Sequence, residues 1–259
     1  MHRVIWGLVI SVCLFAAVVG AQPVDTPDPD EAAIIKNIKI DPSPMRYWQL
    51  SRVRARHAAK LYQSWQRDGQ VKEYQKALFY ARSAAQLQPD WDEPWLLLGM
   101  IYAEMKADRD AMEAAAAALI KAVDANPANG RAQILLAQVL LEQGRYWSAI
   151  EQYQSLIAKN KAMQNGTVIS QLTFCYIADG RVQAGLDYLL QLLQDESYQG
   201  DRDWVRICAA VLLKTRGDRN KAVNLLESVY LPDLEKRHGS ENPKVKQIKY
   251  LIGSWKEER

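Results

Sequence analysis

A repeat of about 36 residues constrains the fold of this chain more than any other feature of its 259 residues. Turn-forming glycines interrupt apolar stretches at Gly144, Gly180 and Gly217, which are 36 and 37 residues apart, and Gly69 lies about two periods earlier. Small residues follow the turns with a similar period: Ala77, Ala115, Ala149, Gly185 and Ala222. Self-similarity at this spacing is typical of a solenoid, in which each supersecondary unit packs against its neighbours.

Each repeat contains two apolar-periodic stretches of helical length. The expected helix pairs are 46–67 with 71–87, 93–105 with 109–124, 130–142 with 146–159, 166–178 with 182–194, and 203–215 with 219–233. The composition favours an all-helical protein, because Ala, Leu and Gln are abundant and Gly and Pro are sparse. We expect Asp92, Asn129 and Asp203 to cap three of these helices.

The second repeat carries a distinctive set of residues: Trp95, Leu98, Gly99, Tyr102, Ala115, Leu119, Ala122 and Pro127. This pattern resembles the signature of the tetratricopeptide repeat family, and a weaker likeness extends over about residues 46–234. The third to fifth repeats lack the closing proline of the family pattern. The resemblance implies an all-α, right-handed superhelical solenoid of about five helical hairpins. It also implies that Gly99 and Ala115 are small because the helices cross closely there.

The N-terminus departs from the repeat. Residues 1–21 combine Arg3, an apolar run and small residues before Ala21, which is typical of a secretory signal peptide cleaved after Ala21. An uncleaved membrane anchor is the alternative. Either interpretation predicts that the body of the protein is periplasmic or secreted. Residues 22–44 hold five prolines and several acids and are expected to be a flexible linker, in which "EAAIIKNIKI" fits either a short helix or a strand.

The C-terminal end is expected to close the solenoid. After a repeat region over residues 45–239, residues 240–259 read as a capping helix that begins at Asn242-Pro243. Its apolar residues fall on one helical face: Val245, Ile248, Leu251, Ile252 and Trp255. A solenoid leaves an open apolar face at its last repeat, so capping is the favoured interpretation. A partner-binding helix is the alternative.

The sequence shows no catalytic or metal-binding pattern. Beyond residue 21 the histidines are His57 and His238, and neither has a Cys, Asp or His partner at metal-ligand spacing. No glycine-rich phosphate loop or nucleophile elbow is present. Cys175 and Cys208 each lie in an apolar helical stretch and are expected to be buried free thiols. We therefore expect a non-enzymatic protein without a cofactor, and the net charge of +3 does not favour nucleic-acid binding.

The resemblance implies that the first helix of each hairpin lines a concave groove. The groove positions carried onto this sequence are Arg56, Gln63, Arg67, Leu96, Met100, Ile134, Gln138, Leu141, Phe174, Ile177, Trp204, Ile207 and Val211, with Gln66, Glu104 and Ser170 beside them. The set is polar and basic in the first repeat and apolar in the last two. An apolar strip suits a peptide or an amphipathic helix, although packing inside the protein is the alternative. The family's pattern for clamping a peptide carboxylate is not present.

A second feature is basic. Arg46, Arg52, Arg54, Arg56 and Lys60 lie on the first long helix, where they fit contact with an acidic partner, contact with membrane headgroups, or a solvated face.

The leading hypothesis is a cell-envelope adaptor that holds a segment of a partner protein in its groove. The alternatives are a permanently assembled subunit of a larger envelope or secretion complex and a chaperone-like accessory factor.

Overall fold

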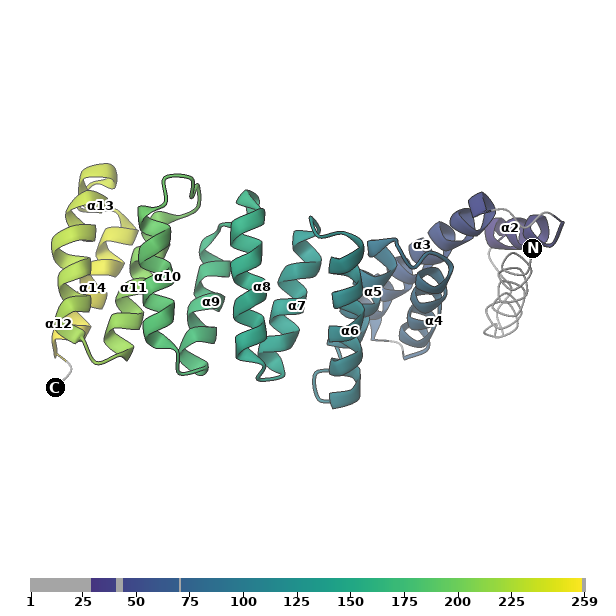
Figure 1. Cartoon of the computed structure of the whole chain (residues 1–259), viewed down its shortest axis with the longest axis horizontal. Coiled ribbons are helices and arrows are strands. Elements are labelled where there is room, and N and C mark those ends of the chain that lie inside the picture. The colour runs from purple at the N-terminus through teal and green to yellow at the C-terminus, as the bar shows by residue number, and fades with distance from the viewer. Residues whose placement is uncertain (1–28, 41–43, 70, 258–259) are drawn as a thin grey trace, which may run out of the picture. The chain divides into compact units, whose positions relative to one another are not determined.

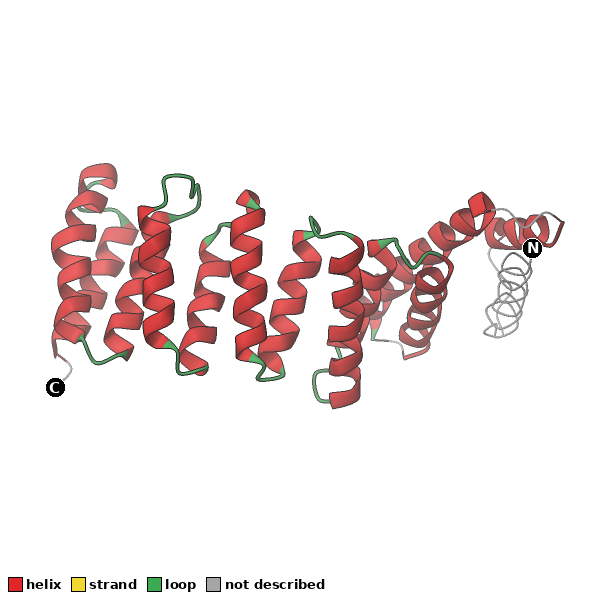
Figure 2. Cartoon of the chain, viewed as in Figure 1, coloured by secondary structure: helices red, strands yellow, loops and turns green. Residues whose placement is uncertain are grey.

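The computed structural model describes residues 29–40, 44–69 and 71–257, and all regular structure in this part of the chain is helical (Figure 2). The chain divides into two compact units, an N-terminal unit of residues 1–127 and a C-terminal unit of residues 128–259. The expectation of an all-α repeat fold is confirmed. The predicted signal segment, residues 1–21, lies outside the described residues. No described helix has both the length and the apolar character that crossing a bilayer requires.

The N-terminal unit holds two hairpins and one preceding helix. Its helices are α2 (Pro29–Ile40), α3 (Pro44–Asp68), α4 (Val71–Leu87), α5 (Asp92–Ala103) and α6 (Arg109–Ala125). Helix α3 pairs with α4, α5 pairs with α6, and α4 packs against α5. Ala77, Ala81 and Ala84 have no exposed surface, because α4 approaches its neighbours through a face of small side chains.

The C-terminal unit continues the same pattern, and helices α7 to α12 follow one another in sequence order (Figure 1). The helices are α7 (Gly130–Glu142), α8 (Tyr146–Lys159), η1 (Lys161–Met163), α9 (Gly166–Ala178), α10 (Val182–Gln194), α11 (Arg202–Thr215), α12 (Arg219–Asn224), η2 (Leu225–Tyr230), α13 (Leu231–His238) and α14 (Pro243–Glu257). Helix α14 packs against α12, η2 and α13, and it buries Val245, Ile248, Ile252 and Trp255.

Most helix boundaries match the sequence-based expectation, and the fifth hairpin differs. Its second helix was expected over 219–233 but runs to His238 in three segments, α12, the π-helix η2 and α13. Pro232 lies in the first turn of α13. Because proline has no amide hydrogen, it cannot donate the α-helical bond to the residue four positions earlier. The wider π turn precedes the point where that regular bonding is interrupted.

Close helix crossings explain the glycines inside helices. A Cβ atom built on Gly99 of α5 would lie 2.4 Å from Cγ of Leu119 on α6, and Leu119 is fully buried. A Cβ atom on Gly185 of α10 would lie 2.6 Å from Cγ of Tyr176 on α9. Both distances are far below a normal carbon contact of about 3.5–4.0 Å. The expected reason for the small residue at Gly99 is therefore confirmed.

The turn glycines also act as expected. Gly144 and Gly180 have φ angles of 73° and 72°, in the left-handed region, and Gly69 and Gly217 do likewise. A residue with a side chain is strained at such angles, so glycine is favoured where one helix ends and the next begins.

Residues 29–40 differ from the flexible linker that was expected for 22–44. They form α2, which packs on α3 and buries Ile35 and Ile38 near Leu50. Nε of Arg54 on α3 donates to Oε1 of Glu31 on α2 at 2.8 Å, and both side chains are buried. Of the two alternatives expected for "EAAIIKNIKI", the structure has the short helix, which long-range contacts dock on α3. The rest of 22–44 is described only at Pro44, where α3 begins.

The expected helix caps are correct in one case of three. Oδ1 of Asn129 accepts a hydrogen bond from the amide of Ala132 and caps α7. Asp92 is instead the first residue of α5, and its carboxylate accepts from Asn126 at 3.0 Å. Helix α11 is capped by Asp201 rather than by Asp203.

Candidate partner-binding site

The apolar positions expected in the fourth and fifth hairpins come together in the C-terminal unit. Helices α9 and α11 pack against each other. The ring of Trp204 covers Gly166, where an added Cβ would lie 2.9 Å from it, and Trp204 Nε1 donates to the hydroxyl of Ser170. Phe174 lies one turn beyond Ser170 on α9 and is 53% exposed. The tryptophan therefore joins the two helices while 40% of its surface remains open.

Helix α14 supplies a further wall that sequence analysis did not place in the site. A groove of about 470 Å³ lies between α11 and α14, lined by Trp204, Ile207, Lys246, Gln247, Ile248, Tyr250 and Leu251. Tyr250 is 79% exposed. The helical periodicity of the sequence could have indicated that Tyr250 is exposed, because Tyr250 lies outside the apolar face of α14 that is buried. We call Phe174, Ile177, Trp204, Ile207, Val211 and Tyr250 the α9–α11–α14 face.

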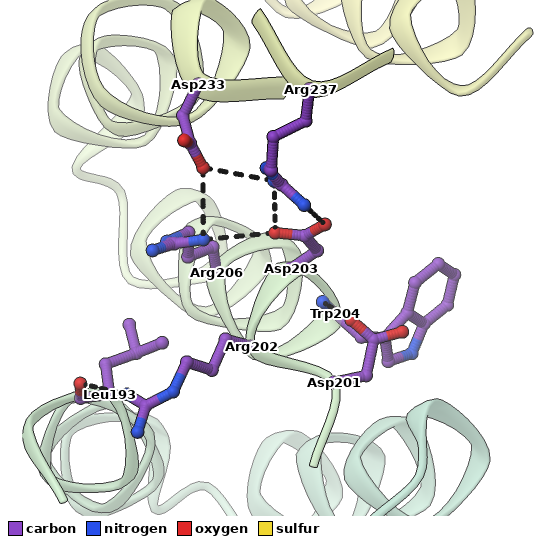
Figure 3. A network of polar contacts seen from close by, with 8 residues as sticks. All are labelled: Leu193, Asp201, Arg202, Asp203, Trp204, Arg206, Asp233 and Arg237. Carbon is purple, nitrogen blue, oxygen red and sulfur yellow. Dashed lines mark hydrogen bonds and ion pairs between the residues drawn. The ribbon is translucent and has the colours of Figure 1, made fainter. Parts of the chain in front are cut away.

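The start of α11 is fixed by polar contacts (Figure 3). Oδ1 of Asp201 accepts from the amide of Trp204, and Nη1 of Arg202 donates to the carbonyl of Leu193 at 2.6 Å. Asp203 accepts two hydrogen bonds from Arg237 of α13, at 2.8 and 2.9 Å. These bonds hold the helix on both sides, so Trp204 is presented from a firmly positioned backbone.

The thiols beneath the face are inert at neutral pH. Cys175 and Cys208 are buried and unpaired with each other, as expected. Burial raises the pKa of Cys175 to about 11, and burial likewise raises the pKa of Cys208. Burial also raises the pKa of Tyr176 to about 12. Each group therefore keeps its proton near pH 7, and neither cysteine is a thiolate nucleophile there.

The other predicted groove residues of this unit lie on α7. Ile134, Gln138 and Leu141 are half-buried on a helix that pairs with α8. These residues are the predicted groove positions of the third hairpin. The contacts that unite the α9–α11–α14 face come from the fourth and fifth hairpins and from α14.

In the N-terminal unit the predicted positions are polar, as expected. Arg56, Gln63 and Arg67 are exposed on α3. Gln66 donates to Glu104, the residue after α5, at 3.1 Å, and the Tyr62 hydroxyl donates to the same carboxylate at 2.6 Å.

Helix α5 contributes less than predicted. Leu96 is only 7% exposed, so its assignment to a binding surface is wrong, whereas Met100 is half-buried. The hydrophobic stretch of α5 packs into the core of this unit, and periodicity alone did not separate its buried side from its groove side.

The described residues hold no group of three His, Cys, Asp or Glu side chains suited to a metal ion. His57 packs edge-on against Tyr80, with its Nδ1 3.8 Å from Oε2 of Glu31. This histidine has a packing role between α2, α3 and α4. His238 ends α13 and is exposed.

Comparisons with known proteins agree with the repeat architecture. The tetratricopeptide repeat family model matches residues 112–162. A comparison with curated proteins found no match.

Solved structures share the fold at low identity. The MamA protein aligns with a TM-score of 0.51 and 16% identity, over 72% of this chain and 93% of MamA. A chain of the Naa15/Naa10 complex bound to HypK-THB aligns with a TM-score of 0.52 and 14% identity, over 86% of this chain but 30% of that chain. YrrB, described as a TPR protein with an unusual peptide-binding site, aligns at 17% identity, over 75% of this chain and 89% of YrrB, with a TM-score of 0.47.

The match over residues 112–162 falls within a longer series of hairpins that cross through small residues and turn at left-handed glycines. Over this segment, and in its all-α repeat fold, the chain is similar to tetratricopeptide repeat proteins.

Proposed function

We propose that this protein is a non-enzymatic interaction module that holds a segment of a partner protein on the α9–α11–α14 face. Tetratricopeptide repeats are protein-interaction scaffolds, which supports the general role. The observation that carries the specific proposal is the position of Trp204, which bonds to α9 and lines the α11–α14 groove together with Tyr250. Phe174 is exposed on the same helix, α9. Exposed apolar patches with polar surroundings are typical of interaction sites.

The exposed area of the three aromatic side chains is large enough to contribute to binding. A fully covered aromatic side chain buries about 150–250 Å², so the exposed parts of the three rings offer on the order of 350 Å². At about 25 cal/mol per Å², covering them contributes roughly 9 kcal/mol before the costs of association. Those costs are of similar size. A partner must therefore add contacts of its own, which favours a peptide or helix long enough to cross several helices.

The cell envelope is the proposed location, and it rests on the signal-like sequence of residues 1–21. A cleaved protein would act in the periplasm or outside the cell, and an uncleaved one would remain anchored to a membrane. The partner would then be a component of an envelope assembly. Permanent incorporation into a larger complex and shielding of an apolar client remain the alternative roles.

Site-specific photo-crosslinking tests the proposed face. A photoreactive phenylalanine analogue at position 174 or 250 should crosslink the partner, and the same analogue at Leu190 should not. Leu190 lies on α10, the second helix of its hairpin, and is 39% exposed, so it controls for exposure. Equal crosslinking from all three positions would contradict the proposal.

Substitutions give an independent test. Phe174→Asp and Tyr250→Asp should reduce capture of the crosslinked partner, because each places a carboxylate on the apolar face. Val229→Asp is the matched control, since Val229 is 57% exposed and lies on η2. If both face variants fold and retain the partner, the proposed face is wrong. Co-expression separates the alternative of a permanent subunit, which predicts that the isolated chain aggregates unless its partner is present.

A further inference from the structure

A line of positive charge runs along one side of α3 in the N-terminal unit. Arg52, Arg56, Lys60 and Arg67 are all exposed. Their separations of four, four and seven residues return to the same side of an α-helix. The 25 residues of α3 include one acid, Asp68, at the last position. We call these four cations the α3 stripe.

The stripe begins at a hollow between α3 and α2. The hollow is about 530 Å³ in volume and is lined by Asp30, Ala33, Ile34, Gln49, Arg52, Val53 and Arg56. Small and apolar side chains from both helices contribute to its wall, and two guanidinium groups lie beside them. Helix α2 precedes the first hairpin, so this hollow is not part of the repeat itself.

The hollow has a firmly docked wall. Glu31 of α2 receives the buried hydrogen bond from Arg54, and Ile35 and Ile38 pack into a buried cluster with Leu50. Arg54 also donates to the hydroxyl of Ser83 on α4. These contacts fix α2 against the first hairpin.

The spacing of the cations favours an extended acidic ligand. Four residues of α-helix rise about 6 Å, which is the axial separation between Arg52 and Arg56 and between Arg56 and Lys60. Alternate side chains of an extended chain repeat every 6.6–6.8 Å or so. Carboxylates at alternate positions of a peptide would therefore meet successive cations. Arg56 and Lys60 form no ion pair with other residues in the part of the chain that the structure describes.

We propose that the α3 stripe and the α2–α3 hollow bind an extended acidic segment of a partner protein, with an apolar side chain of that segment seated in the hollow. Guanidinium groups pair strongly with carboxylates, because they donate parallel hydrogen bonds in a fixed geometry. The hollow distinguishes a peptide from a bilayer: a peptide side chain can enter it, whereas a flat layer of lipid headgroups reaches only its rim. This site lies in the N-terminal unit and does not depend on the α9–α11–α14 face.

A blocked peptide tests the proposal directly. The probe is a fluorescent peptide, acetylated and amidated at its ends, with the sequence Ser-Leu-Ser-Asp-Ser-Asp-Ser-Asp-Gly, in which the leucine and the aspartates share one face of the extended chain. Binding to the purified chain is followed by fluorescence anisotropy. We expect an affinity that falls as salt rises, and a loss of about tenfold or more in the Arg56→Glu, Lys60→Glu double variant. The matched control is the Lys159→Glu, Lys161→Glu double variant, which changes two exposed lysines of the C-terminal unit and should bind normally.

A second variant tests the hollow apart from the charges. Ala33 lines the hollow and is exposed, so Ala33→Trp should fill the space without disturbing a core. It should lower the affinity for the leucine peptide to that of a peptide with serine in place of leucine. The serine peptide itself should bind wild type and Ala33→Trp equally. An Ala33→Trp protein that keeps the preference for leucine would overturn the placement of the apolar side chain.

Three outcomes would overturn the proposal as a whole. The first is equal binding of a peptide with asparagine at every aspartate position. The second is capture of phosphatidylglycerol vesicles with no binding of the acidic peptide, which would assign the stripe to a membrane surface. The third is peptide binding that appears only in the Asp25→Asn, Asp28→Asn double variant. That result would mean that the ligand of the stripe is the chain's own acidic segment. Phe174→Asp should leave peptide binding unchanged, so failure here is distinguishable from failure of the C-terminal face.

Discussion

Replacing Gly185 by alanine sets helix propensity directly against packing. Gly185 lies inside α10, where alanine is intrinsically favoured by about 1 kcal/mol. The added Cβ would lie 2.6 Å from Cγ, 2.8 Å from Cδ2 and 2.9 Å from Cβ of Tyr176. Tyr176 is 3% exposed, and its hydroxyl accepts a hydrogen bond from Gln154 at 2.7 Å. Since the clash involves the base of the tyrosine side chain, a rotation of the ring cannot relieve it.

The expected result is a net loss of stability. Forcing one carbon into a packed contact costs about 1–3 kcal/mol, and the required shift of nearly 1 Å places Gly185→Ala at the upper end. After the gain in propensity, the free energy of unfolding should fall by roughly 1–2 kcal/mol. For a protein of this size that corresponds to a decrease in Tm of about 2–8 °C.

Gly253 provides the matched control. It lies inside α14 of the same unit, and a Cβ atom added there would meet nothing within 4 Å. Gly253→Ala should raise the free energy of unfolding by about 0.5–1 kcal/mol. Both variants can be compared with wild type by thermal circular dichroism at 222 nm. A Gly185→Ala protein that melts at or above the wild-type temperature would refute the packing argument.

Three further changes test other contacts. Glu31→Gln leaves Arg54 buried without its ion-pair partner, which typically lowers the free energy of unfolding by about 3–5 kcal/mol. Hydrogen exchange in α2 should therefore accelerate strongly. Asp203→Ala removes both bonds to Arg237 and should weaken the docking of α13 by about 1 kcal/mol, measured by hydrogen exchange over 231–238. Alkaline pH should destabilise the fold: burial raises the pKa of Cys175 from 9.0 to about 11, so the folded state holds its proton more tightly and stability falls as pH rises from about 9 to 11.

Each of these predictions has a control or a contrary result. Lys36→Gln changes an exposed side chain of α2 and should leave exchange in α2 near the wild-type rate. Unchanged exchange over 231–238 in Asp203→Ala would mean that apolar packing alone holds α13. Cys175→Ala should flatten the alkaline fall in Tm, and a fall of equal steepness would point to the buried tyrosines instead.

Local chemistry made the hairpins predictable. Gly144 and Gly180 occupy turns that require positive φ, and the apolar period gave the bounds of α7, α8, α9 and α10 as the structure has them. These features depend on residues a few positions apart, which a single sequence displays. Gly99 was also interpretable, because a glycine inside a strongly apolar helix indicates a close crossing.

Features that depend on distant partners were missed. Asp203 was predicted to cap α11, whereas Asp201 caps it and Asp203 accepts from Arg237, 34 residues further along the chain. The docking of α2 on α3 was also missed, because its ion pair joins Glu31 to Arg54, which is 23 residues away in the sequence. In neither case does the spacing along the chain indicate that the two groups meet.

The sequence alone determined the all-α repeat, the turn positions and the apolar character of the last hairpins, since these follow from backbone preference and helical periodicity. The tertiary structure decided which apolar residues are surface and which are core. It buried Leu96, left Phe174 open, and placed Tyr250 of α14 beside Trp204 of α11. The physical reason is that exposure depends on what packs against a side chain, and in a solenoid the covering residues come from another helix of the stack.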